Sequence, residues 1–272
     1  MLFFFFMVVG LFFMVLGVFN YVVWWGMFIV MDLVFVFIGK KLSSYGGLLN
    51  YFVFQESLAL LFLVVFLGVV QGVVVMTKMG LAPFHYWLFV VVGGLESWLF
   101  MWFLTFQKLP FMGVLMVVMV VELVFLVVLG FFLCYFQLLL LKDYKLMLMI
   151  NSTESFGWIL LGYVFFLWGG MFLFVYYFFL SLFLIPVFGG EKLLDYEWLV
   201  LLMYVNIPLG VLFFVKVYVV SFVFSSFFVW MIGVLFFMFI NFFSLMVWLL
   251  GKSVEEGFFV GKMSVFFYLV LG

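Results

Sequence analysis

The chain has 272 residues, of which 72% are hydrophobic and only 8% charged, and its formal net charge is −1. A soluble domain of this length needs far more polar surface, so the composition excludes one and predicts an all-α membrane protein with many spans. The balanced charge gives no reason to expect a nucleic-acid partner. The single cysteine, Cys134, excludes an internal disulfide, and the single histidine, His85, excludes metal sites built on histidine pairs.

A membrane-spanning helix needs about 20 mainly apolar residues. Divided at its polar and glycine interruptions, the sequence predicts about eleven such spans. They are residues 2–19, 21–39, 49–70, 72–90, 97–116, 117–137, 145–162, 163–188, 198–219, 221–250 and 257–271. The shortest linkers are at Gln71/Gly72, near Leu115, at Gly162/Tyr163 and near Val220.

Charged residues are concentrated in a few linkers between these spans. They are Lys40-Lys41, Glu96, residues 142–145, residues 191–197 and residues 252–256, with Lys262 beyond. In an eleven-span chain each of these linkers follows an even-numbered span, so all of them lie on the side of the N-terminus. Because lysine excess marks the inner side of a membrane, the N-terminus is expected to face the matrix or the cytoplasm.

Three lysines, Lys78, Lys108 and Lys216, lie inside predicted spans. An ammonium at the centre of a bilayer costs about 2.5–3.5 kcal/mol, so such residues normally face a bundle interior or a water-filled path. Lys108 is about twelve residues into its span, where its side chain cannot easily reach the membrane surface, whereas Lys78 could extend to the interface. Unlike arginine, lysine can give up its proton when it is buried, which makes these three residues candidate proton sites.

Each lysine is close to residues that interrupt a helix. The expected breaks are at Gly80, Pro83, Pro110, Pro208 and Gly210. Interrupted helices beside an ionisable group, paired in two halves of a chain, are typical of transporters with inverted repeats. The alternative is a structural kink with no part in transport.

Three short segments occur in order along the chain: KMGLAPFHYW at residues 78–87, TFQKLP at 105–110 and SFGW at 155–158. They resemble the antiporter-like core subunits of respiratory complex I, in a shortened, Phe-rich form such as nematodes carry. The resemblance covers roughly residues 20–220 and rests mainly on the first two segments; beyond 220 it is one of hydropathy alone.

The resemblance implies two inverted five-helix repeats with two broken helices, within a single membrane domain. The first repeat would be residues 1–116, the second 117–250, and a final helix 251–272. Lys78 would be the lysine of the first half-channel, Lys108 the connecting lysine and Lys216 the lysine of the second half-channel.

It also implies a proton-pumping subunit of the inner mitochondrial membrane that carries no redox site of its own. NADH, FMN, iron–sulfur clusters and ubiquinone would be bound by partner subunits, and phospholipids and other membrane-arm subunits would surround this chain. A stand-alone cation/proton antiporter and a non-pumping structural spacer are the alternatives.

The sequence departs from the family at the acidic partner of Lys78. The family has a glutamate after a Trp-x-Gly-x pattern, and here Phe28 follows Trp24-Trp25-Gly26-Met27. A buried lysine needs an acidic partner to remain charged. Asp32 and Glu56 are the candidates, and Glu56 is slightly favoured.

Three further ionisable residues have an open role. His85 matches the family's histidine and is either a proton relay or a kink residue. Glu122 lies in an apolar stretch and is either on the proton path or structural, with a hydrogen-bonded partner expected in both cases. Glu154 follows Lys145 on the same segment, and contact with a partner subunit is one of its possible roles.

Overall fold

The computed structural model of the chain describes residues 2–40, 43–65, 68–95, 97–141, 143–188, 213, 216–221, 223 and 230–243. Within these ranges the regular elements are helices, and extended pairing is limited to one bridge between Ser43 and Leu95. The expectation of an all-α chain is therefore confirmed. Pro208, Gly210, the span 257–271 and most of the span 198–219 lie outside the described residues.

The helices follow one another with short connections. They are α1 (Leu2–Gly17), α2 (Tyr21–Gly39), α3 (Tyr45–Val64), α4 (Gly68–Met79), α5 (Trp87–Val92), α6 (Ser97–Leu104), the 3₁₀ turn η1 (Phe106–Lys108), α7 (Leu109–Val118), α8 (Val121–Leu140), α9 (Tyr144–Phe165) and α10 (Leu167–Phe188). Residues 230–243 are also helical. The divisions between α7 and α8 and between α9 and α10 fall within a few residues of the expected ones.

The division between the third and fourth predicted spans lies elsewhere than expected. The sequence predicts it at Gln71/Gly72, whereas α3 ends at Val64 and α4 begins at Gly68. Gln71 is not a linker residue: it is buried in the first turn of α4, and its side-chain amide donates to the carbonyl of Val65 at 2.7 Å. The side chain thus satisfies a carbonyl that the end of α3 leaves without an intrahelical partner.

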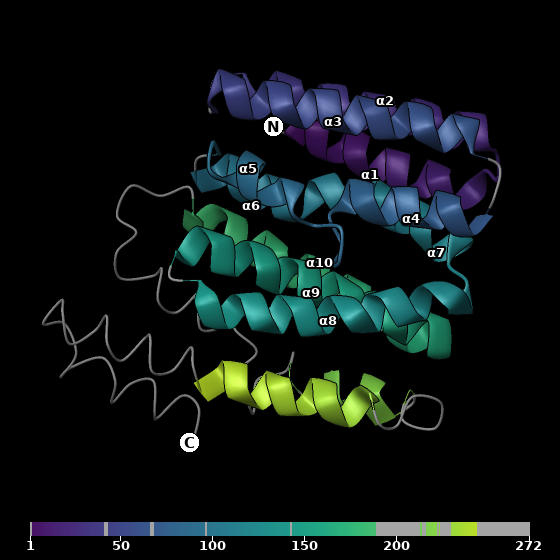
Figure 1. The fold of residues 1–272 in the computed structure, drawn as a ribbon. Helices are drawn as coiled ribbons and strands as arrows, with labels where there is room; N and C mark the ends of the chain where they lie inside the picture. The colour runs from purple at the N-terminus through teal and green to yellow at the C-terminus, as the bar shows by residue number, and fades with distance from the viewer. Residues whose placement is uncertain are drawn as a thin grey trace, which may run out of the picture.

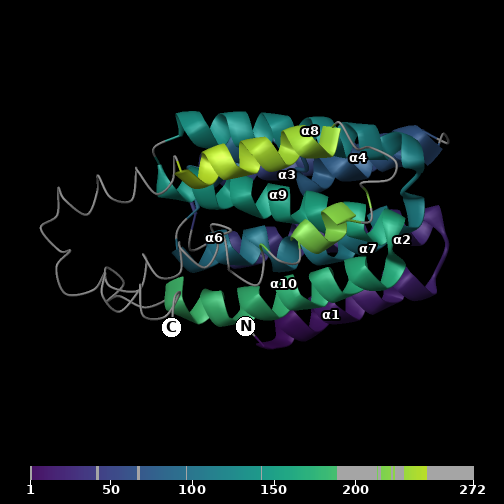
Figure 2. The ribbon, with the colours of Figure 1, turned by 90° about the horizontal axis from the view of Figure 1, so that it is seen from below.

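The helices lie side by side in three groups, with α4–α7 between α1–α3 and α8–α10 (Figure 1). α8 and α10 both pack against α9, and α7 packs against α1 and α4. α1 also meets α10 along one edge (Figure 2), where the Phe12 ring stacks on that of Phe174. The central position of α6–α7 explains why 89% of the window at residues 98–118 is buried, compared with 22% for α3.

The central group contains two interrupted helices. α4 ends at Met79, Gly80 has a φ of 68°, and helix resumes as α5 at Trp87. A positive φ is readily adopted only by glycine, so Gly80 ends α4 as the sequence predicts. α6 and α7 likewise lie end to end on either side of a break halfway along the bundle (Figure 1).

The second break is not at Pro110, where the sequence predicts it. The helix is interrupted at residues 105–108, and Pro110 lies in the first turn of α7. Proline is well tolerated there because a first-turn residue needs no N–H donor. The proline therefore begins the new helix rather than forming the break.

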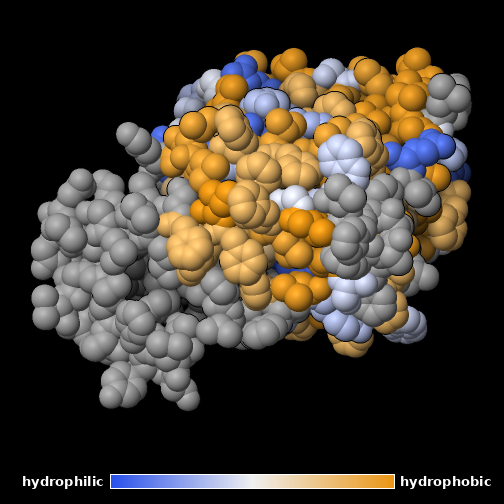
Figure 3. Space-filling model, turned by 60° about the horizontal axis from the view of Figure 1, so that its bottom comes forward, coloured by the Kyte–Doolittle hydropathy of each residue, from blue (hydrophilic) through white to orange (hydrophobic). Residues whose placement is uncertain are grey.

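The surface is as apolar as the composition requires. Four described helices are long and apolar enough to cross a membrane, at residues 21–39, 45–64, 98–118 and 122–140. Hydrophobic side chains cover most of the described surface in Figure 3. Trp168 and Phe172 of α10 and Phe136 of α8 are more than half exposed. Such a surface is suited to lipid or to other apolar helices and not to water.

Several charged connections meet at one end of the bundle. The α2–α3 and α5–α6 connections are joined by the Ser43–Leu95 bridge and by the Ser44 N–H donating to the Gly94 carbonyl, at 3.2 Å. Lys145, at the start of α9, donates to the Leu95 carbonyl at 3.3 Å. Lys40 and Lys145 thus lie at the same end, as expected from the positions of their linkers.

We expect Gly130→Ala to destabilise the protein. A methyl group at Gly130 of α8 would meet the backbone carbonyl of Ala82, inside the first break, at less than van der Waals distance. Overpacking of this kind costs about 1–3 kcal/mol, so the midpoint of heat-induced unfolding in detergent should fall. Gly26→Ala is the matched control, since a methyl group there meets nothing within 4 Å. An equal effect of both substitutions would contradict the packing described.

Candidate functional site

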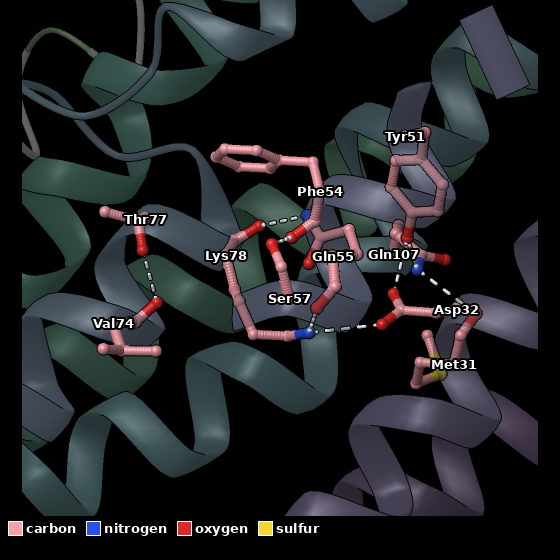
Figure 4. A network of polar contacts seen from close by, with 10 residues as sticks. All are labelled: Met31, Asp32, Tyr51, Phe54, Gln55, Ser57, Val74, Thr77, Lys78 and Gln107. Atoms are coloured by element: carbon pink, nitrogen blue, oxygen red, sulfur yellow. Dashed lines mark hydrogen bonds and ion pairs between the residues drawn. The ribbon is translucent and has the colours of Figure 1, made fainter. Parts of the chain in front are cut away.

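Lys78, in the last turn of α4, forms a buried ion pair with Asp32 of α2. Its ammonium nitrogen lies 3.2 Å from Asp32 Oδ2, and both side chains are fully shielded from solvent. The ammonium also donates to the Gln55 carbonyl of α3 at 2.8 Å (Figure 4). The rings of Phe28 and Phe111 lie 5.3 and 5.4 Å from the nitrogen. A cation in the last turn of a helix is also stabilised by the helix dipole.

The other oxygen of Asp32 begins a chain of hydrogen bonds that leads toward the second break. Tyr51 donates its hydroxyl to Asp32 Oδ1 at 2.7 Å. The amide of Gln107 donates to Tyr51 Oη at 2.6 Å and to the Met31 carbonyl at 3.2 Å (Figure 4). Gln107 directly precedes Lys108 in the sequence, so this chain of hydrogen bonds ends beside the second buried lysine.

The preference for Glu56 as the partner of Lys78 is wrong, because Asp32 forms the pair. Neighbouring residues of a helix point about 100° apart, and on α3 the inward position belongs to Gln55. The side-chain amide of Gln55 donates to the Lys78 backbone carbonyl at 3.0 Å, and the backbone carbonyl of Gln55 accepts a hydrogen bond from the Lys78 ammonium. Glu56 is only half-buried, whereas Asp32 is completely buried.

Lys108 is buried among neutral groups. Its ammonium nitrogen lies 3.4 Å from Ser152 Oγ of α9 and 4.9 Å from the centre of the Phe156 ring. Ser152 also accepts a hydrogen bond from the Tyr177 hydroxyl of α10, at 3.1 Å. In the part of the chain that the structure describes, no carboxylate lies within ion-pair distance of Lys108. A lysine in such surroundings is able to change its protonation state.

A small cavity separates Lys78 from Lys108. Its volume is about 10 Å³, which is roughly the space that one water molecule needs. Both lysines line it, together with Tyr51, Gln55, Met79, Trp87, Phe103, Gln107 and Phe111. The two lysines and the polar side chains between them therefore share one interior space.

Lys216 forms a second buried ion pair, with Glu154 of α9, at 2.8 Å. The same carboxylate oxygen accepts hydrogen bonds from the Tyr135 hydroxyl at 2.7 Å and from the Trp158 indole at 3.0 Å. Glu154 is 1% exposed, so it lies in the interior of this chain, and the possibility that it faces a partner subunit is wrong. A carboxylate in an apolar helix, one turn before a tryptophan, was the sequence signal for this site.

The remaining candidates fall on different parts of the fold. His85 lies buried in the first break, where its Nε2 shares a hydrogen bond with the side chain of Gln137 of α8.

Glu122 is exposed in the first turn of α8, outside the buried clusters, although the sequence predicts a hydrogen-bonded partner for it. An acidic residue is favoured there by the positive end of the helix dipole. Within the described ranges no cluster of His, Cys, Asp and Glu is suited to a metal ion.

Apolar helices that hold buried lysine–carboxylate pairs define an α-helical membrane protein with ionisable groups in its interior. No protein-family model matches the chain. It is 43% identical over 277 residues to NADH-ubiquinone oxidoreductase chain 2 of Ascaris suum, covering 99% of this chain and 90% of that protein. The protein of the same name from Caenorhabditis elegans is 39% identical over 240 residues, which are 87% of this chain and 84% of the relative. The chain therefore belongs to the NADH-ubiquinone oxidoreductase chain 2 family, and the resemblance to a shortened nematode form is confirmed.

We expect Asp32→Asn to destabilise the protein more than the double substitution Asp32→Asn/Lys78→Met. Removing one partner of a buried pair leaves an uncompensated charge, at a cost of about 3–5 kcal/mol, whereas removing both charges is often nearly neutral. The quantity to measure is the amount of chain that survives heating of solubilised membranes. Glu56→Gln is the control and should have the smallest effect. A larger loss for Glu56→Gln than for Asp32→Asn would contradict the pairing.

Proposed function

We propose that the chain is a membrane-arm subunit of respiratory complex I and takes part in moving protons across the inner mitochondrial membrane. The names of its relatives support a place in an NADH–ubiquinone oxidoreductase. Oxidation of NADH and reduction of ubiquinone would take place in partner subunits, which would bind FMN and the iron–sulfur clusters. The observation that carries the proposal is the buried series Asp32–Lys78, Lys108 and Glu154–Lys216, which crosses the interior of the bundle.

The charges of this series suit electrostatic coupling. The Asp32–Lys78 pair has a net charge of zero when both groups are ionised, while Lys108 lies between neutral groups. In surroundings of low dielectric constant, a change of charge at one site alters the energy of its neighbours by several kcal/mol at short range. A proton bound at Lys108 would therefore weaken the hold of Lys78 on its own proton, and the reverse. Quinone reduction elsewhere in the complex would start such changes.

The broken helices leave space beside these lysines that a proton path would use. A break frees backbone carbonyls that must be satisfied inside the membrane. Here the Trp87 indole donates to the Thr77 carbonyl at 2.9 Å, and the Gln55 amide satisfies that of Lys78. The interruption is thereby stable while leaving a cavity with room for one water molecule between the two lysines.

The membrane arrangement belongs to the same proposal. The chain would cross the inner membrane about eleven times, with its N-terminus on the matrix side. Residues 1–116 and 117–250 would form the two inverted repeats and residues 251–272 a last helix. Phospholipids and neighbouring subunits would cover the apolar surface.

Membership of the complex can be tested directly. Digitonin-solubilised native membranes are separated on a native gel, stained for NADH dehydrogenase activity, and searched for peptides of this chain by mass spectrometry. We expect the peptides in the large active band. A small separate species would contradict the proposal and favour a stand-alone antiporter. Membership without any effect of the lysines on pumping would favour a structural spacer.

We expect Lys108→Met in the assembled complex to lower the number of protons moved per electron pair. The substitution fills a similar volume but removes the buried ammonium that lies between the two ion pairs in the described part of the bundle, so a proton can no longer be held there. The ratio is measured in sealed inner-membrane vesicles, with NADH oxidation and proton uptake followed together. Lys40→Met is the control, because Lys40 is exposed at the end of α2. An unchanged ratio in Lys108→Met would contradict a role in translocation.

A further inference from the structure

We propose that Glu154, Lys216 and Tyr135 form a second proton-exchange site, in which Glu154 receives the proton that Lys216 releases. The inference rests on the proposed function and adds to it an acid and a positioning tyrosine in the second half of the chain. Glu154 would touch the transferred proton, whereas Tyr135 would hold the carboxylate in place.

The site is built like the one around Lys78. In each, a buried lysine lies within 3.2 Å of a buried carboxylate. In each, a tyrosine hydroxyl 19 residues away in sequence donates to that carboxylate at 2.7 Å from a neighbouring helix, Tyr51 to Asp32 and Tyr135 to Glu154. The same arrangement of lysine, carboxylate and tyrosine thus occurs on both sides of Lys108, on helices that the sequence assigns to different repeats.

Each lysine also faces an aromatic ring, which stabilises its charged form. The nitrogen of Lys216 lies 6.0 Å from the Trp158 ring, and that of Lys78 lies 5.3 Å from the Phe28 ring. Trp158 additionally donates its indole N–H to Glu154 Oε1. The lysine, the tyrosine and the tryptophan all donate to this one oxygen, and hydrogen bonds to a charged group are the strong ones.

A cavity adjoins Glu154 on the side of the first break. Its volume is about 10 Å³, enough for about one water molecule. Leu81 and Ala82 of the break line it, together with Val127, Gly130, Phe131, Cys134, Thr153, Glu154 and Gly157. The close approach of Gly130 to Ala82 brings α8 against this break. A water molecule in this cavity would lie between the carboxylate of Glu154 and the interrupted backbone at Leu81 and Ala82.

The exchange conserves charge within the pair. An N–H bond of Lys216 breaks and an O–H bond of Glu154 forms, so an ammonium and a carboxylate become an amine and a carboxylic acid. The net charge of the pair is zero before and after. Uptake of a further proton by the amine leaves the pair with one positive charge, which would repel a proton on Lys108.

The described groups that lie around this pair come from the helices packed against α9. From α8 they are Cys134 and Tyr135; Cys134 lies 3.6 Å from Thr153 Oγ1. From α10 Tyr177 reaches Ser152, which also contacts Lys108. The third element packed against α9 is α5, which carries no ionisable side chain. Among the described residues, Lys216 is thus the cation paired with Glu154.

The test is Glu154→Gln in the intact complex. The amide oxygen still accepts from Tyr135 and Trp158, but Lys216 loses its counter-charge and gives up its proton at lower pH. Because the amide cannot take up the proton that Lys216 releases, we expect fewer protons to be moved per electron pair, and the alkaline limit of the remaining pumping to move to lower pH by about 1–3 units, the effect of removing an opposite charge at this distance. Glu154→Asp, which retains the charge, should restore much of the profile. Glu122→Gln, at the exposed acid of α8, is the control and should leave the profile unchanged.

The outcomes separate this inference from the proposed function. A wild-type profile in Glu154→Gln, together with reduced pumping in Lys108→Met, overturns the second site alone. Normal pumping in both variants overturns the proposed function as well. If Glu154→Gln fails to assemble, Tyr135→Phe is decisive, because it retains both charges and removes one donor to the carboxylate. The acid limit of pumping should then move to higher pH, and an unchanged limit overturns the inference.

Discussion

The structure depends on the pairing of charges inside an apolar bundle. An ammonium group that no water reaches is stable only if a carboxylate or several dipoles compensate it, and Asp32 provides the carboxylate for Lys78. This requirement places α2 beside the end of α4. It also brings Tyr51 and Gln107 into contact with the pair, which ties α3 and η1 to the same point. Much of the packing of the first half can thus be understood from a single ion pair.

The broken helices follow from the same constraint applied to the backbone. A carbonyl released in the middle of a membrane must find a donor, and both breaks occur where polar side chains are already buried. Gln55 stabilises both the break and the charge. Its side-chain amide donates to the Lys78 backbone carbonyl, and its backbone carbonyl accepts from the Lys78 ammonium. The charged side chain and the interruption of the helix therefore stabilise each other.

The sequence predicts the helical class, most helix limits and the first break, because these depend on local composition and on glycine and proline. It places Lys78 and Lys108 in the interior correctly, because the cost of a charge in lipid does not depend on the fold. It favours Glu56 over Asp32 as the partner of Lys78, which is wrong, because the direction in which each side chain points depends on how the helices pack. It misses the Glu154–Lys216 pair, since residues 62 positions apart in sequence meet only through the packing of the helices. The roles of Pro208 and Gly210 lie outside the described residues.

The difference between paired and unpaired lysines has a consequence for the response to voltage. A transmembrane potential acts on net charge, with about 2.3 kcal/mol for each elementary charge moved across 100 mV. While both of their groups are ionised, the pairs Asp32–Lys78 and Glu154–Lys216 are neutral as units and experience almost no net force. Lys108 carries a full charge whenever it is protonated, since its described neighbours are a hydroxyl and an aromatic ring. Within the described bundle, the energised membrane would therefore act mainly on the proton at Lys108.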